Sequence, residues 1–263
     1  MKKYIKKLWN ASLYNIKSID KLHYIIFILM FFSLEYYVRV INSVYSNKET
    51  FDIFVNSFKA FDKMSIILIE IIICAYIIKI NQDKKNILIR TNDYSILLNA
   101  NLLSVIILNI IIIGMVTITM FLVSLIAANF NIDIKYILKY ASRFKIVLYF
   151  IIIYILISSF YGIFMMIIYR ITKSIKFTIL ISFLYSFYNL FLYPFLKVKW
   201  LQFLFIDYQL DLSTIINLYS SKINKYYSNR ILYCFILFIV TLMLYSMLSN
   251  YKILKYTEKN SNL

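Results

Sequence analysis

The sequence predicts an all-α polytopic membrane protein with six transmembrane helices, and two observations lead to this prediction. First, 62% of the 263 residues are hydrophobic and the mean hydropathy is +0.75, whereas soluble domains are about 45–50% apolar. Second, the apolar residues gather in runs. With their flanking residues, these runs supply the roughly 20 residues that a helix needs to cross the hydrocarbon core. Hydropathy rather than any motif therefore defines the fold class.

Residues 1–22 predict an amphipathic helix that lies in the membrane interface. Apolar residues recur there at three- and four-residue spacing, while the lysines fall mostly elsewhere on the helix. Trp9 suits the headgroup level, and Lys6 and Lys7 lie beside it in the sequence. The apolar stripe consists of Ile5, Leu8, Trp9, Ser12, Ile16 and Ile19. A basic tail without structure is the alternative, and the regular stripe argues against it.

The remaining elements follow from the apolar runs and from the few helix breakers. The predicted order is transmembrane helices at 23–44 and 62–80, an elbow at 81–98, transmembrane helices at 99–128, 145–169 and 175–193, an outer connection at 194–229, a last transmembrane helix at 230–250 and a tail at 251–263. Pro194 ends the fifth helix because it lacks an N–H donor, and Gly162 permits close packing of the fourth. Polar residues of the third helix predict a seam with other helices; they are Asn101, Ser104, Asn109, Thr117 and Ser124.

The net charge of +17 indicates a membrane surface rather than nucleic acid. The basic residues lie between apolar runs instead of on a soluble face, where anionic lipid headgroups are their natural partners. A small excess of Lys and Arg falls on the side of the two termini, the elbow and a basic turn at residues 170–176. The positive-inside rule therefore places both termini in the cytoplasm of a multi-pass plasma-membrane protein.

Three charged residues lie in the predicted transmembrane helices away from the two residues at each helix end. Glu35 and Arg39 are four residues apart, so they can neutralise each other near the outer end of the first helix. Glu70 lies close to the middle of the second helix. An acid in the hydrocarbon region is a candidate functional residue. The other interpretation of Glu70 is structural, as a buried carboxyl group that hydrogen-bonds to a neighbouring helix.

Composition argues against catalysis and against a bound cofactor in this chain. Gly114 and Gly162 are the two glycines, and neither a Walker A loop nor a dinucleotide-binding loop can be written with them. His23 is the single histidine, so a zinc site of the H-E-x-x-H type is excluded. Cys74 and Cys234 both fall in apolar runs and predict small core residues. We expect no metal, no cofactor and no catalytic residue, and any ATP hydrolysis would belong to another subunit.

The connection between the second and third transmembrane helices is the most distinctive stretch. It carries basic residues, the apolar triplet at 87–89 and a capping-type cluster at 91–93, followed by more apolar residues. This pattern predicts two short amphipathic pieces with a turn between them at the membrane surface. Such an elbow is either a docking surface for a soluble partner or a connector without one.

This layout resembles the permease subunit of ABC-2 type transporters, in particular the small permeases that handle lantibiotics and other antimicrobial peptides in Gram-positive bacteria. The local match is KNILIRTNDYSILLNANLL at 85–103. Asp83 stands for the acidic residue of the family's elbow, 87–89 for its leucine-rich turn and 91–93 for its break. The Gly-Thr and the Pro of the family are absent, which leaves open a degenerate member or one half of a heterodimer.

The resemblance implies a homo- or heterodimer of six-helix halves that exports an amphipathic, peptide-like or lipid-like substrate, powered by a separate ATPase subunit. The residues that it places at the ATPase are Ile87, Leu88, Arg90, Asp93 and Tyr94, and those that it places along the translocation path are Glu35, Arg39 and Glu70. A non-transporting immunity or scaffold protein is the alternative. An ion-coupled secondary transporter is disfavoured, because such folds rely on helices broken by Gly or Pro.

Overall fold

The computed structural model describes residues 2–19, 94–128, 141–192 and 230–248, together with short helical pieces at 50, 53–54, 72–73, 75–77 and 80. All regular structure in these segments is helical, which confirms the all-α class for them. The long helices are α1 (Lys2–Lys17), α4 (Tyr94–Ala127), α6 (Ala141–Thr172), α7 (Ile175–Leu192) and a further helix at Arg230–Leu248. The predicted first transmembrane helix, the elbow up to residue 93, the outer connection and the tail lie outside the described residues.

Three of the described helices are long and apolar enough to cross a membrane. They comprise Ile96–Ala127, Val147–Thr172 and Arg230–Leu248. A shorter apolar helix at Ile175–Tyr185 belongs to α7. The membrane character predicted from hydropathy is therefore present in the structure, in the regions predicted as the third, fourth and sixth transmembrane helices.

The helix bounds differ from the sequence-based expectation mainly in α4 and α6. α4 begins at Tyr94, five residues before the expected start at 99, and directly follows the capping-type cluster at 91–93. α6 begins at Ala141 rather than at 145. In α6 the helix continues beyond the apolar run into polar residues, whereas residues 94–98 of α4 were assigned to the elbow because they follow a polar stretch. With 34 residues, α4 is about 51 Å long, which exceeds the roughly 30 Å of the hydrocarbon core.

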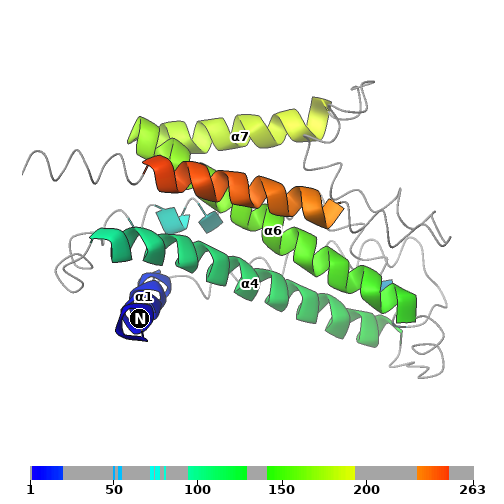
Figure 1. Ribbon diagram of the computed structural model, residues 1–263. Helices are drawn as coiled ribbons and strands as arrows, with labels where there is room; N and C mark the ends of the chain where they lie inside the picture. The colour runs from blue at the N-terminus through cyan, green and yellow to red at the C-terminus, as the bar shows by residue number, and fades with distance from the viewer. Residues whose placement is uncertain are drawn as a thin grey trace, which may run out of the picture.

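In the view of Figure 1 the four long apolar helices run lengthwise, whereas α1 lies across the start of α4. Four helix ends lie at the same end of the molecule as α1: the start of α4, the end of α6, the start of α7 and the end of Arg230–Leu248. We call this the α1 end. The last residues of the predicted elbow, which form the start of α4, and the basic turn between α6 and α7 therefore lie at one end of the bundle.

The turn between α6 and α7 consists of Lys173 and Ser174. Lys173 has φ 53°, in the left-handed region, and its N–H donates to the carbonyl of Tyr169 at 2.8 Å. The Ser174 hydroxyl accepts a hydrogen bond from the N–H of Phe177 at 3.5 Å, so Ser174 caps the first turn of α7. The tight basic turn predicted at 170–176 is confirmed.

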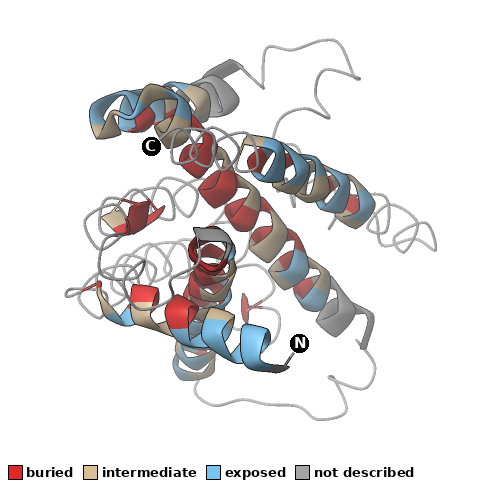
Figure 2. Cartoon of the chain, turned by 60° about the vertical axis from the view of Figure 1, so that its left-hand side comes forward, coloured by how far each residue is buried: buried red, intermediate tan, exposed pale blue. Residues whose placement is uncertain are grey.

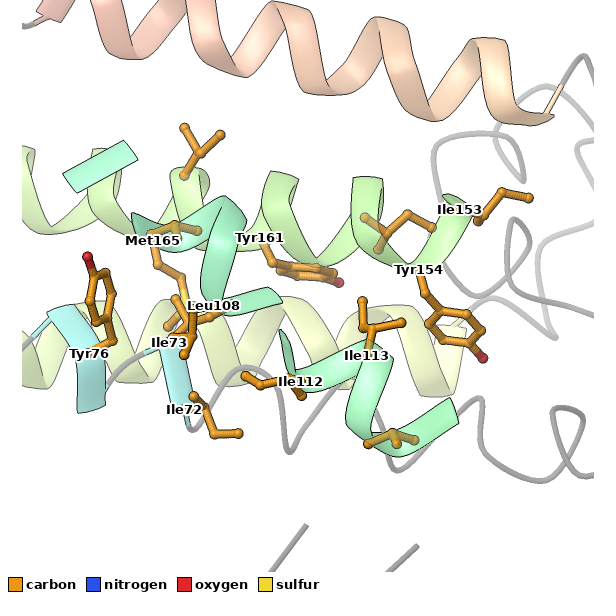
Figure 3. Close-up of a cluster of buried hydrophobic side chains, with 14 of the residues drawn as sticks. Ile72, Ile73, Tyr76, Leu108, Ile112, Ile113, Ile153, Tyr154, Tyr161 and Met165 are labelled. Carbon is orange, nitrogen blue, oxygen red and sulfur yellow. The ribbon is translucent and has the colours of Figure 1, made fainter. Parts of the chain in front are cut away.

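The core lies between α4, α6 and the helical pieces at 72–77. Ile73, Leu108 and Met165 come from these three parts of the chain, are fully buried and lie next to one another (Figure 3). The two long helices meet closely at Gly162, where an added Cβ atom would overlap Cγ1 of Val105. The close packing predicted at Gly162 is confirmed.

Large apolar side chains also cover the outside of the bundle. The exposed ones on α4 recur every three or four residues and include Met115, Ile118, Leu122 and Ile126. The Arg230–Leu248 helix exposes Leu232, Phe235, Ile236, Met243, Leu244 and Met247. An apolar surface of this extent suits a lipid environment rather than water.

Candidate functional site

The most polar buried region among the described residues is the contact between α1 and the start of α4, which we call the α1–α4 junction. It consists of Ser12 and Asn15 on α1, Ala100, Asn101 and Ser104 on α4, and Tyr76. Figure 2 shows that the C-terminal half of α1 is buried against the bundle while its N-terminal half is exposed. Small residues, including Ala11, bring the two helices close enough for side chains to reach backbone atoms of the facing helix.

Two serines hold the backbones of the two helices together. Ser12 Oγ donates either to the carbonyl of Leu8 in its own helix, 2.9 Å away, or to the carbonyl of Ala100 on α4, 3.2 Å away. Ser104 Oγ has a matching choice, between Ala100 O at 2.6 Å and Ser12 O at 3.2 Å. Because each hydroxyl hydrogen can rotate between the two acceptors, each serine can bond within its helix or across the junction.

Asn15 is the central side chain of the junction. Its Nδ2 donates to Asn101 Oδ1 at 3.0 Å and to Ser104 Oγ at 3.3 Å. The hydroxyl of Tyr76 is buried beside Asn15 and Ser104. Asn15 Oδ1 and the Tyr76 hydroxyl have no hydrogen-bond partner of good geometry among the described residues. The junction is thus almost fully hydrogen-bonded, and the two remaining polar atoms lie in the same small region.

A second set of contacts ties the start of α4 to the ends of two other helices. Arg170, in the last turn of α6, lies 4.1 Å from the ring centroid of Tyr245, and its Nη2 donates to the Tyr245 hydroxyl at 2.7 Å. That hydroxyl in turn donates to the carbonyl of Leu98 on α4 at 3.2 Å. Three helices that are far apart in the sequence therefore meet within one turn of the residue at which α4 emerges from the elbow.

Five polar residues of α4 were predicted to face other helices, and three of them bond to another helix. Asn101 and Ser104 bond to α1, and Asn109 Nδ2 donates to Ser159 Oγ on α6 at 3.5 Å. The hydroxyls of Thr117 and Ser124 instead donate to carbonyls of their own helix, four residues earlier. Ser124 is fully buried and Thr117 is half-buried.

The residues that the sequence predicted as functional fall into three groups. Seven of them lie outside the described residues: Ile87, Leu88, Arg90, Asp93, Glu35, Arg39 and Glu70. Tyr94 is the first residue of α4, so the predicted ATPase-facing segment runs directly into that helix. The interface residues Lys6, Lys7 and Trp9 are on α1 and are exposed.

Sequence reasoning missed Asn15, Tyr76, Arg170 and Tyr245 as members of a site. Asn15 falls between apolar positions of α1 but is itself polar, so a hydropathy stripe does not select it. Tyr76 and Tyr245 are two of 25 tyrosines, and nothing in the sequence separates them from the others. The one signal in the sequence that could have indicated the junction is an Asn at helical spacing from small residues.

The α1–α4 junction is a network of neutral hydrogen-bonding groups that joins two helices. No group of three or more His, Cys, Asp or Glu side chains capable of holding a metal occurs among the described residues. The groups of the junction are neutral amides, hydroxyls and carbonyls, and they bond to one another. Such networks fix the position of one helix on another. A displacement of the start of α4 would therefore be passed to α1, α6 and the last helix.

Comparison of the chain with protein-family models, curated proteins and solved structures gives no match. The class of the protein therefore follows from its own structure. The structure is that of a helical membrane protein, because it has apolar helices of membrane length, an apolar outer surface and a basic helix across one end. Its activity is a matter for proposal.

Proposed function

We propose that this chain is the membrane-spanning subunit of a transporter that is powered by a separate ATPase subunit. The supporting observation is the way in which α4 starts. It begins at Tyr94, the last of the predicted ATPase-facing residues, and its first three turns are bonded to α1 and to the Arg230–Leu248 helix, which in turn bonds to α6 through Tyr245 and Arg170. An elbow that is pushed by a partner needs such a firmly held helix behind it.

In this proposal the elbow converts closure of the ATPase into movement of the helices. Ile87 and Leu88 supply apolar contacts to a groove of the ATPase, and Arg90, Asp93 and Tyr94 fix the register of the elbow in that groove. The push reaches α4 along its axis. Because of the junction and the Arg170 contact, the helix ends at the α1 end move with it as a rigid body.

The complete proposed architecture has six transmembrane helices in a plasma-membrane protein whose termini and elbow face the cytoplasm. Two such halves, identical or paralogous, enclose the path. The substrate is an amphipathic peptide or a lipid-like molecule that moves out of the cell or out of the membrane. Glu35, Arg39 and Glu70 line or gate this path, because charged groups in a transmembrane helix face a protein interior or a hydrated cavity.

The elbow is tested by Leu88→Asp and Asp93→Lys. The chain is co-expressed with any nucleotide-binding subunit that a neighbouring reading frame encodes, and the ATPase that purifies with the chain and its hydrolysis rate are measured. We expect both variants to lose the ATPase while the chain still inserts into the membrane. Ile171→Asp is the matched control, because Ile171 is an exposed apolar residue at the same end of the bundle.

The same experiment separates this function from that of a non-transporting immunity or scaffold protein. A transporter subunit confers peptide resistance only when the ATPase is active, so replacing the Walker lysine of the ATPase abolishes resistance. An immunity or scaffold protein confers resistance regardless of that lysine. Retention of the ATPase by Leu88→Asp as fully as by Ile171→Asp would show that the elbow is not the docking segment.

A further inference from the structure

The exposed half of α1 has two different surfaces. Ile5 and Trp9 have exposed fractions of 53% and 48%, and with the half-buried Leu13 they form a stripe with four-residue spacing beside the docked face. The lysines occupy the side of the helix away from the α1–α4 junction; those with exposed side chains are Lys3, Lys6, Lys7 and Lys17. α1 thus presents an apolar flank and a cationic face at the same time.

No acidic residue balances this charge within α1 itself, whose sequence is KKYIKKLWNASLYNIK. The described residues include no Asp or Glu, so no carboxylate among them pairs with these lysines. A cationic face of this kind favours an anionic partner from outside the described residues.

The direction of α1 identifies where that partner is. The axis of α1 lies across that of α4 in both views (Figures 1 and 2), and α1 lies against the start of α4. If α4, α6 and Arg230–Leu248 cross the bilayer, then α1 lies in the plane of its surface. At that depth Trp9 and Ile5 reach the acyl boundary while the lysine ammonium groups reach the phosphates.

We propose that the exposed half of α1 is a binding surface for anionic phospholipids, with Lys3, Lys6 and Lys7 at the phosphates and Ile5 and Trp9 between the lipids. A soluble acidic partner would satisfy the lysines but would leave the apolar flank in water, whereas a lipid surface satisfies both. The opposite face of α1 holds Asn15 and therefore contacts α4. With lipid on one face and α4 on the other, α1 is held between the two, independently of any ATPase.

The test uses Trp9 as the reporter. The chain contains two tryptophans, so Trp200→Phe leaves Trp9 as the single one. This full-length protein is placed in nanodiscs of phosphatidylcholine and phosphatidylglycerol, with bromine on the acyl chains of one lipid at a time. Bromine quenches tryptophan only at short range, and the two brominated lipids are compared at the same mole fraction.

We expect brominated phosphatidylglycerol to quench Trp9 more strongly than brominated phosphatidylcholine. Each lysine near an anionic leaflet raises partitioning by a factor of about five, so Lys3→Gln, Lys6→Gln and Lys7→Gln together remove the preference, and high salt weakens it. The control is Lys173→Gln with Lys176→Gln, which alters exposed lysines of the α6–α7 turn at the same end. This control keeps the preference.

Three results would overturn the proposal. Equal quenching by the two lipids shows that headgroup charge does not matter. Quenching by neither lipid shows that Trp9 lies outside the bilayer and that this face serves another macromolecule. Loss of the preference in the control variant as well shows that the charge of the whole end, rather than α1, attracts the lipid. Circular dichroism of each variant in the nanodiscs checks that its helix content equals that of the parent protein.

Discussion

Gly162 offers a sharp quantitative test of the helix packing, because the chain contains a second glycine in a comparable position. Both Gly162 on α6 and Gly114 on α4 are in helix interiors, and replacing either by Ala gains about 1 kcal/mol of helix propensity. The two sites differ in their surroundings. A Cβ at Gly114 meets no atom within 4 Å, whereas a Cβ at Gly162 overlaps Val105 Cγ1.

The cost at Gly162 follows from the stiffness of its neighbour. Val105 is fully buried, and a valine in a helix has one strongly preferred rotamer. The side chain therefore cannot turn away, and α4 and α6 must separate instead. Overpacking of this kind costs about 1–3 kcal/mol. Ile73 adds nothing to the cost, because its nearest atoms would lie at an ordinary contact distance of 3.5 Å.

We therefore expect Gly162→Ala to be less stable than Gly114→Ala by about 1–3 kcal/mol, since the propensity terms cancel. Gly114→Ala itself should be slightly more stable than the parent protein. The free energy of unfolding is measured by titrating the protein in mixed micelles with dodecyl sulfate and following helix content. Val105→Ala removes the overlapping atom, so it should restore part of the stability in the Gly162→Ala background. If the two Ala variants differ by less than about 0.5 kcal/mol, or Val105→Ala gives no rescue, the described crossing of α4 and α6 is wrong.

Two further pairs of variants test the α1 end of the bundle by the same unfolding measurement. Asn15→Ala removes two buried hydrogen bonds and should cost about 1–2 kcal/mol, whereas Asn10→Ala on the exposed side of α1 should cost almost nothing; equal losses would contradict the burial of Asn15. Lys173→Gly should stabilise the protein by up to about 1 kcal/mol, because glycine adopts φ 53° without strain. Lys176→Gly, three residues later in the first turn of α7, should destabilise it by less than about 1 kcal/mol, and a reversal of these signs would exclude the left-handed turn.

The sequence predicted which parts of the chain are helical and apolar, because that property is local. The start of α7 at Ile175 agrees with the prediction, since the basic turn before it interrupts the apolar pattern. The start of α4 was placed too late, because residues 94–98 were assigned to the elbow from their position after a polar stretch. In the structure Ile96, Leu97 and Leu98 belong to α4 and are buried.

The partners of the polar residues could not be predicted in the same way. Spacing indicated that Asn101, Ser104 and Asn109 face a neighbouring helix, but it cannot say which one. Their partners are on α1 and α6, up to 92 residues away in the sequence. The expected stripe of α1 placed Ile5 and Trp9 with Ser12, whereas the docked face is centred on Ser12 and Asn15. Hydropathy alone cannot separate a flank that faces lipid from a face that packs against protein.

The position of the Val105–Gly162 crossing along its two helices has a mechanical consequence. At 1.5 Å per residue, α4 extends about 16 Å from Val105 to Tyr94 and about 33 Å from Val105 to Ala127. α6 divides at Gly162 in nearly the same proportion, about 15 Å toward Thr172 and about 31 Å toward Ala141. The short arms of both lie at the α1 end. If the two helices pivot as rigid rods about this contact, a small change in the separation of their short ends is about doubled at their far ends.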